Sequence, residues 1–456
     1  MSTLVARTVR TPDNSPVSFP NGIMIGTAVG AGAINHIGTP GQQGFGVGIA
    51  PSIPANFAKL YGTDDPSADT YGNYQYSDGS IMCYQPVSCY KYGTGANGLA
   101  INNCDIKPFS YFENSLTIAN AAGYALHRTF YNNGSIRPGF MHDKYKCSLN
   151  GTIASSIKNG VVLTSAQRGS LSTAVFSSCT GNGQTPSNNF SGAIAAAKSR
   201  GNQFFPHTQF MRAWLALVSL AHGKASTGTT YNAWYDATGV NNFPKGNNNN
   251  ALGDINDATI AYVYDGNGTY LGCGKTGSAN FFAKTTHNGQ GNGVCDTNGL
   301  VWDIEPFGIT SDGANFYLLN TAADVSAMTG GNTLATDAWG ATGLAALYTS
   351  IGATYGSMTA SSTNKTFGAA AQVLSEATSG TPWAMAGAGI PLLGGVGGSN
   401  QFGNDYFYDG PRPNELCVIG GAAWNGGSIA GCWARYFSLV RSTSSVYYGF
   451  SSACYL

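Results

Sequence analysis

Residues 420–456 read GGAAWNGGSIAGCWARYFSLVRSTSSVYYGFSSACYL, and they mix two kinds of position. One kind is a framework of glycine and aromatic residues, types that form tight turns and core contacts. Its members are Gly420, Gly421, Trp424, Gly431, Trp433, Gly449 and Phe450. Between them stand residues with no common chemistry, such as the run that contains Thr443, Ser445, Val446 and Tyr447. This alternation predicts a rigid scaffold that holds a set of replaceable contact residues.

The composition narrows the classes of partner. The chain has 456 residues, of which 43% are hydrophobic, so it can bury a substantial core. Only 10% are charged and the formal net charge is zero, which argues against binding nucleic acid through its phosphates. The 63 glycines and 25 tyrosines predict many turns and an aromatic-rich surface, as in antibody contact regions.

The sequence also predicts where the chain folds. No apolar run is long enough for a transmembrane helix, so we expect no membrane insertion. Residues 1–20 are interrupted by Arg, Pro and Asp and do not resemble a secretory signal, which favours folding in a bacterial cytoplasm. The ten cysteines include no CxxC pair, and we expect them to be mostly free, buried thiols.

The pattern of elements predicts an α+β fold. Residues 1–65 are rich in Gly, Pro and Ala and are expected to form an attachment or assembly segment, followed by a ligand-binding domain over 66–456. Apolar periodicity predicts two helices, 115–130 and 208–222, with Gly223 ending the second. Strands are predicted at 81–84 paired with 87–91, and at 139–146, 260–264, 299–302 and 315–319. Residues 321–381 have weak helical periodicity and are predicted to be an insertion.

None of the short motifs that resemble catalytic or metal sites is complete. GCGKTG at 272–277 lacks the first glycine of a phosphate-binding loop and precedes no predicted helix. The histidines form no metal-binding spacing, and His127 and His222 are expected to pack or cap. Asp303 and Glu305 could pair for acid–base chemistry, but a structural role in closing a loop is preferred. We therefore predict no catalytic residues, no metal and no cofactor.

Four motifs occur in an order that resembles a known family. DKYKCS at 143–148, NGLVWDIEPFG at 298–308, GGAAWNGGSIAG at 420–431 and YGF at 448–450 are similar to the motifs of the C-type-lectin-like fold of the formylglycine-generating-enzyme group. The resemblance implies a C-type-lectin-like fold with two helices, short antiparallel strands and long loop insertions.

Two functions occur within this group. The formylglycine-generating oxidase needs a cysteine pair after the GG motif; this chain has Asn425 and Cys432 there, so one cysteine is missing. The other branch comprises the variable proteins of diversity-generating retroelements, among them phage tropism determinants at tail-fibre tips. The chain resembles this second branch more. The resemblance implies a virion protein that is not an enzyme and that binds a host cell-surface receptor, either a protein or a glycan. It also implies a homotrimer that assembles with other tail proteins. A retroelement-diversified cell-surface display protein is the alternative.

The retroelement mechanism limits which residues can vary, because AAY codons mutated at adenine cannot become Trp, Met, Gln, Lys or Glu. The predicted variable region is about 400–450. Its candidate ligand-binding residues all satisfy this limit: Asn404, Tyr406, Phe407, Tyr408, Asn425, Ile429, Tyr436, Ser438, Leu439, Thr443, Ser445, Val446 and Tyr447. Of the neighbouring aromatic residues, Tyr436 and Tyr447 are expected to be exposed, and Phe437 and Tyr448 to fill the core.

Overall fold

A six-stranded antiparallel sheet occupies one side of the protein, whose computed structural model describes residues 34–235, 249–328, 344–367, 372–392 and 405–456. Its strands follow the order β1 (Phe57–Lys59), β2 (Asn73–Tyr76), β3 (Ile81–Pro86), β9 (Gly139–Asp143), β22 (Ser452–Tyr455) and β12 (Phe205–Pro206). We call it the N-terminal sheet. The last strand of the chain lies within it, because β22 pairs with β9 on one side and with β12 on the other.

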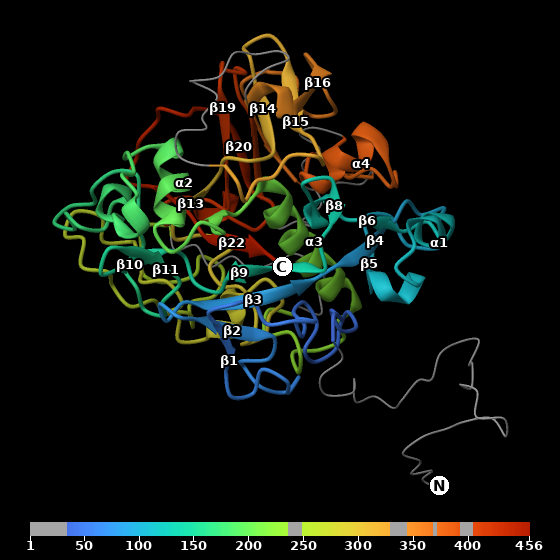
Figure 1. Ribbon diagram of the computed structural model, residues 1–456, viewed down its shortest axis with the longest axis horizontal. Coiled ribbons are helices and arrows are strands. Elements are labelled where there is room, and N and C mark those ends of the chain that lie inside the picture. The colour runs from blue at the N-terminus through green and yellow to red at the C-terminus, as the bar shows by residue number, and fades with distance from the viewer. Residues whose placement is uncertain (1–33, 236–248, 329–343, 368–371, 393–404) are drawn as a thin grey trace, which may run out of the picture.

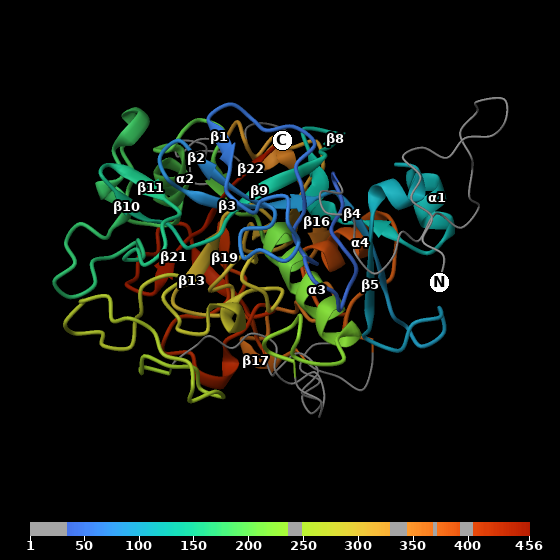
Figure 2. The ribbon, with the colours of Figure 1, turned by 90° about the horizontal axis from the view of Figure 1, so that it is seen from below.

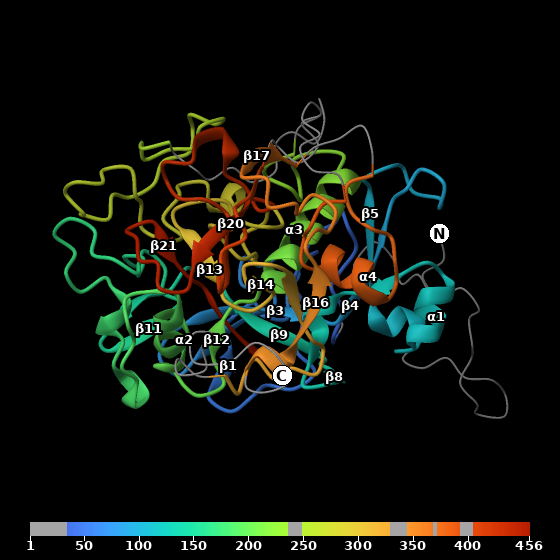
Figure 3. The ribbon, with the colours of Figure 1, turned by 90° about the horizontal axis from the view of Figure 1, so that it is seen from above.

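A second six-stranded sheet, the C-terminal sheet, lies on the opposite side in Figure 1. Its order is β17 (Thr363–Thr366), β18 (Tyr406–Asp409), β20 (Arg435–Val440), β19 (Leu416–Gly420), β13 (Trp302–Glu305) and β21 (Tyr448–Gly449). β18 pairs in parallel with β20, as β13 does with β21, so the expectation of antiparallel strands is wrong at these two pairs. Figure 3 shows β20, β13 and β21 of this sheet from above.

Four smaller sheets complete the strand content of the described residues. They comprise β4 (Ser88–Tyr92), β5 (Cys104–Pro108) and β6 (Ala125–Leu126); β7 (Tyr131–Asn132) and β8 (Ser135–Ile136); β10 (Ser148–Asn150) and β11 (Ile153–Ser155); and β14 (Ile309–Ser311), β15 (Phe316–Leu319) and β16 (Tyr348–Gly352). The β4–β5 strands and α1 (Leu116–Ala121) project together at one edge (Figure 2). Open sheets with few helices confirm the predicted α+β class.

The longest helix, α3 (Gln209–Ala225), is central in Figure 1. Thr208 caps its N-terminus by accepting a hydrogen bond from the backbone N–H of Met211, as predicted. Every residue from Gln209 to His222 is buried, and the surrounding core includes side chains from both large sheets. The helix continues through Gly223 to Ala225, so it ends three residues beyond the predicted last residue, His222.

The other helix prediction is wrong over its second half. Ser115 caps α1, but that helix ends at Ala121, and Gly123 adopts a left-handed conformation with φ of 77°. The chain then forms β6 and a short 3-10 turn, Arg128–Phe130. The apolar stripe at 125–130 is therefore buried by a strand and a turn rather than by a helix.

Two further helices were missed. α2 (Phe190–Lys198) is almost entirely buried, so it shows little of the polar–apolar alternation by which a helix is found in a sequence. α4 (Gly380–Gly387) is only two turns long and begins with Gly, Thr and Pro. With α1 and α3 they make four α-helices in the described ranges, against the two expected.

Several strand predictions need correction. β3 and β4 do form, but they pair with other strands and not with each other, because the single residue Val87 between them cannot make a hairpin turn. Residues 260–264 contain only isolated bridges, and the strand predicted at 299–302 begins at Trp302.

The two segments predicted at residues 1–65 and 321–381 are not separate from the rest of the fold where the structure describes them. Ile37, Phe45 and Val47 belong to the main core, and β1 joins the N-terminal sheet, so the described part of the 1–65 segment packs into the rest of the chain. Residues 321–381, predicted to be an insertion, contribute β16 and β17 to two sheets. The roles proposed for both segments stay predictions.

Candidate functional site

Three tyrosines from two strands form a row on one face of the C-terminal sheet. Tyr406 and Tyr408 alternate with Phe407 along β18, and Tyr436 lies opposite Tyr408 on the parallel strand β20. The rings of Tyr408 and Tyr436 are 4.6 Å apart at 17°, and those of Tyr406 and Tyr408 are 6.1 Å apart at 9°. All three side chains are half-buried, and we call them the tyrosine row. Because the rings stack on one another, much of each ring face is covered by a neighbouring tyrosine.

The row continues at both ends onto residues that the sequence did not single out. The hydroxyl of Tyr406 donates a hydrogen bond to Oδ1 of Asn364 on the edge strand β17, at 2.7 Å. The ring of Trp302, on β13, lies 6.2 Å from that of Tyr436. Burial, and then the neighbouring tyrosines, raise the pKa of Tyr406 to about 12, so this hydroxyl is neutral at physiological pH. The polar–apolar alternation within VWDIE could have identified Trp302 as a residue of this face. No local sequence pattern identifies Asn364.

Phe407 faces the opposite way and is a correction to the predicted contact set. It is 1% exposed and packs against Phe367 and Phe437, with ring centroids 5.7 and 5.2 Å away. Successive strand residues point to opposite faces, so Phe407 cannot share a surface with its two neighbours. Phe437 is buried, as predicted.

A second aromatic group adjoins the row through Trp302. The rings of Trp424 and Tyr447 are 4.8 Å apart, and Tyr270 lies 6.1 Å from the first and 6.3 Å from the second. The backbone N–H of Trp302 donates to the carbonyl of Tyr447 at 2.8 Å, which fixes the two groups next to each other. Tyr270 belongs to a long loop in which the sequence indicated no contact residue.

The remaining predicted contact residues lie around these two groups. Asn425 is exposed, whereas the other described positions are half-buried: Ile429, Ser438, Leu439, Thr443, Ser445 and Val446. Ser445 is fixed by its backbone N–H, which donates to Oγ of Ser165 at 2.9 Å. Leu439 and Tyr448 pack against the core cluster that contains α2. Tyr448 was expected to fill the core; it contacts the core but is only half-buried. Asn404 lies outside the described residues.

Burial separates the two sets of positions that alternate at the C-terminus. All seven framework residues are buried, and among the twelve described candidate contact residues only Phe407 is buried. Tyr436 and Tyr447, expected to be exposed, are half-buried, with one side against the fold and the other open.

Two framework positions are glycine because a side-chain carboxylate lies where a Cβ atom would be. A Cβ atom on Gly431 would lie 1.9 Å from Oδ1 of Asp405, whose Oδ2 accepts a hydrogen bond from the backbone N–H of Trp433 at 2.8 Å. A Cβ atom on Gly420 would lie 2.2 Å from Oε1 of Glu305. These contacts hold the loop before β20 and the end of β19 in place beneath the tyrosine row.

The carboxylates in VWDIEPFG are structural ion-pair partners. Asp303 and Glu305 are buried on β13 and contact the guanidinium of Arg212 on α3. Lys146 lies 2.7 Å from Asp303, and Arg435 lies 3.4 Å from Glu305. Burial raises the pKa of Glu305, while Arg435 and Arg212 oppose that shift. A structural role was predicted for both carboxylates, through closing a loop. They instead lie on a strand and take part in a network of ion pairs.

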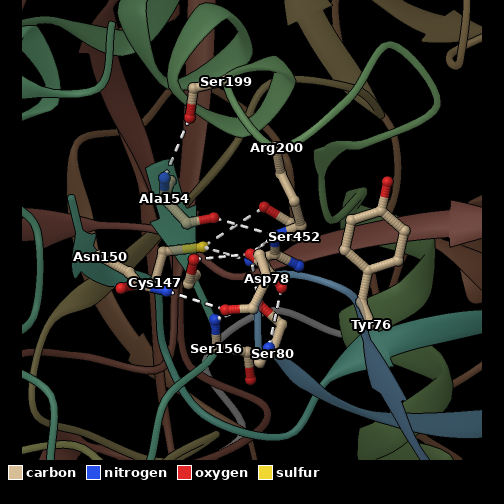
Figure 4. Close-up of polar contacts among 12 residues, drawn as sticks. Tyr76, Asp78, Ser80, Cys147, Asn150, Ala154, Ser156, Ser199, Arg200 and Ser452 are labelled. Atoms are coloured by element: carbon tan, nitrogen blue, oxygen red, sulfur yellow. Dashed lines mark hydrogen bonds and ion pairs between the residues drawn. The ribbon is translucent and has the colours of Figure 1, made fainter. Parts of the chain in front are cut away.

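The DKYKCS motif also lies in a buried polar cluster (Figure 4). Arg200 donates to Asp143 at 2.6 Å, and the backbone N–H of Ser452 donates to the same carboxylate at 2.7 Å. The thiol of Cys147 donates to it at 3.1 Å. The cluster ties the last strand of the chain to the motif and gives the polar residues of the motif a structural role.

The cysteines and histidines follow the packing expectation. All ten cysteines are buried thiols that form no disulfide. His127 caps the turn Arg128–Phe130, and His222 accepts a hydrogen bond from Gly41 N–H and stacks on Phe45. No group of three or more metal-ligating side chains occurs in the described part of the chain. None of the helices described there has the length and hydropathy to cross a bilayer.

Comparisons with known proteins give little further information. No family model matches the chain, and no curated protein matches it. The chain is similar to the solved structure of the Major Tropism Determinant M1 variant, with a TM-score of 0.29 and 11% identity over 82% of this chain and 63% of that one. For the U1 variant the TM-score is 0.29 and the identity 10%, over 83% of this chain and 65% of that one. The chain thus spans less than two thirds of the length of either structure, and TM-scores this low do not establish a shared fold.

Proposed function

We propose that this chain is a receptor-binding protein whose contact surface consists of the tyrosine row, the adjoining Trp424–Tyr447 group and the loops around them. The observation that carries the proposal is the separation by burial: framework positions are buried, and candidate contact positions are half-buried or exposed, with Phe407 as the one exception. Half-buried tyrosines offer rigid contact area at low entropic cost, and neighbouring Ser, Thr and Asn side chains can adapt their hydrogen bonds.

The finer proposal is a C-type-lectin-like variable protein of a diversity-generating retroelement, at the tip of a phage tail fibre. The motif order supports the family, and the geometry supports tolerance of variation. Changing a half-buried residue that packs against no core cluster, such as Tyr408, costs little stability, because the core contacts stay intact. A homotrimer would add avidity to modest single-site affinity. The host receptor is a protein or a glycan on the cell surface.

The genome of the source tests the diversification directly. We expect a near-copy of the coding sequence for about residues 400–450 beside a reverse-transcriptase gene, with adenines at the codons of the contact residues. Phe407 is an informative position, because its burial predicts that any variation there is restricted to apolar residues. A missing template, or mismatches at other than adenine positions, would rule out diversification and leave only an invariant binding protein.

Binding to host cells tests the surface. The full-length protein with Tyr406→Ser, Tyr408→Ser and Tyr436→Ser is expected to lose at least about tenfold in adsorption to intact host cells, since aromatic residues dominate interface energies. Tyr61→Ser is the matched control, because Tyr61 is fully exposed and lies far from these strands in the sequence. Equal adsorption by the triple variant and the control would show that the tyrosine row is not the contact surface.

We propose binding rather than catalysis for this site. A formylglycine-generating oxidase would use copper held by two thiols, and Cys432 is buried in the core cluster around α3. Titration with Cu(I) should give no stoichiometric binding that depends on Cys432; binding lost on Cys432→Ser would favour the oxidase. A cell-surface display protein remains the alternative to a phage protein, and the genes that flank the coding sequence distinguish the two.

A further inference from the structure

A polar cavity lies away from the tyrosine row, between three segments that are distant in the sequence. It has a volume of about 260 Å³ and is formed by the loop before β2, the chain that follows α3 and the turn at 289–292. These segments adjoin β1 and β2, at the opposite end of the view from β19 and β20 in Figure 1. The volume is just below the ~300–1,000 Å³ of sites for drug-sized ligands, so it suits a single small ring.

One polar side chain of this cavity is buried and incompletely paired. Asn292 is 2% exposed and lines the cavity. Its Oδ1 accepts a hydrogen bond from Asn288 at 2.8 Å, and its carbonyl accepts one from Asn73 at 2.8 Å. Its amide nitrogen donates no hydrogen bond to the described residues and is not among their buried unpaired atoms, so it stays accessible to a ligand in the cavity. A ligand oxygen in the cavity would supply an acceptor.

An exposed carboxylate lies beside the turn that carries the amide. Asp69 lines the cavity, and its carboxylate makes no hydrogen bond within the described part of the chain. It approaches the 289–292 turn closely, because a Cβ atom on Gly291 would lie 2.1 Å from its Oδ1. Tyr231, which is 37% exposed, adds an aromatic ring to the lining. The cavity therefore combines hydrogen-bond acceptors, a donor and an apolar surface.

The charge balance favours a neutral ligand. Lys144 donates from its buried ammonium group to the carbonyl of Asp69 at 2.9 Å and to Oδ1 of Asn73 at 2.6 Å. This cation lies close enough to offset the charge of Asp69, and no arginine or lysine lines the cavity to bind an anion. A single carboxylate does not make a metal site, which needs several ligands. Hydroxyl groups can donate to the carboxylate and accept from the amide at the same time.

We propose that this cavity binds one neutral sugar ring, with ring hydroxyls donating to Asp69 and accepting from Asn292, and with the apolar side of the ring near Tyr231. This is a second site, separate from the contact surface proposed above, and it does not depend on that proposal. It would let the protein engage a saccharide on a cell surface through a part of the chain outside the variable region.

Titration of the full-length protein with a panel of methyl glycosides tests the site. The probes are methyl α- and β-glucoside, galactoside, mannoside and N-acetylglucosaminide, with glucosamine and glucuronate as charged counterparts, and binding is followed by NMR saturation transfer and calorimetry. We expect at least one neutral glycoside to bind with higher affinity than both charged sugars. Asp69→Ala should weaken binding at least about tenfold, because hydrogen bonds to a charged group are the strong ones.

Asp64→Ala is the matched control. Asp64 is exposed on the same loop, pairs with Lys59 at 2.7 Å and does not line the cavity, so its removal should leave sugar binding unchanged. The triple tyrosine variant should also bind the sugar normally, which separates this site from the receptor surface. The inference is overturned if no neutral glycoside binds, if a charged sugar binds more tightly, or if Asp69→Ala and Asp64→Ala behave alike.

Discussion

The two faces of the C-terminal sheet differ more than any two strands within it. On one face Phe407 and Phe437 are each 1% exposed and pack into the core around α3. On the other, Tyr406, Tyr408 and Tyr436 stack in an open row. Neighbouring residues of one strand thus serve stability and contact separately, because the side-chain period of a strand is two.

The comparison shows how a surface can change without unfolding the protein. The buried face and the framework glycines hold the sheet, while the tyrosines of the other face stack on one another. Variation at Tyr406 and Tyr408 leaves the core around α3 unchanged, whereas Tyr436 also packs against the core cluster that contains α2. Three substitutions test this division, in order of the expected effect on the free energy of unfolding, and a change of pH tests the core separately.

The largest effect is expected from the buried face. Phe407→Ala should lower the free energy of unfolding by about 3–5 kcal/mol, the range for truncating a buried phenylalanine. Denaturant unfolding followed by tryptophan fluorescence measures it. Phe407→Leu, which keeps most of the volume, should cost much less and retain receptor binding. A loss below about 1 kcal/mol for Phe407→Ala would mean that the two faces are not distinct in energy.

The framework is expected to come next. Gly431→Ala places a methyl group where the carboxylate of Asp405 lies and should cost about 1–3 kcal/mol, as overpacking does. Gly426→Ala is the control in the same loop: Gly426 is half-buried and has φ of −71°, which alanine adopts without strain. Equal unfolding midpoints for the two variants would contradict the rigid framework.

Acid should weaken the core and spare the open face. Burial lowers the pKa of His222 from 6.5 to about 4 and those of His127 and His287 to about 3. Each folded-state pKa lies below the unfolded value, so the stability contributed by the neutral histidine is complete above about pH 6.5 and is lost as the pH falls toward 4. Each histidine should add a slope of about 1.4 kcal/mol per pH unit in that window.

Urea unfolding at about pH 7, 6 and 5 measures this slope. His222→Gln should remove one histidine's share of it, whatever its effect on the stability at pH 7. Stability that stays constant between pH 7 and 5 would mean that these histidines are protonated in the folded protein.

The smallest effect is expected on the open face. Tyr408→Ser should lower the free energy of unfolding by about 1 kcal/mol, the contribution of a cross-strand aromatic pair, while it weakens receptor binding far more. Differential scanning calorimetry beside a cell-adsorption assay compares the two. A stability loss as large as that of Phe407→Ala would place Tyr408 in the framework instead.

By itself the sequence determined the features that depend on local pattern and composition: the α+β class, α3 with its Thr208 cap, the buried cysteines, and the glycine and aromatic framework near the C-terminus. These were accessible because periodicity, capping and turn chemistry act within a few residues. Only the tertiary structure decided which strands pair, that β18 runs parallel to β20, and that Phe407 faces inward while its neighbours face out. It also brought Trp302 and Asn364 to the ends of the tyrosine row and Asp69 and Asn292 into the lining of one cavity, because contacts between residues far apart in the chain are set by how whole elements pack.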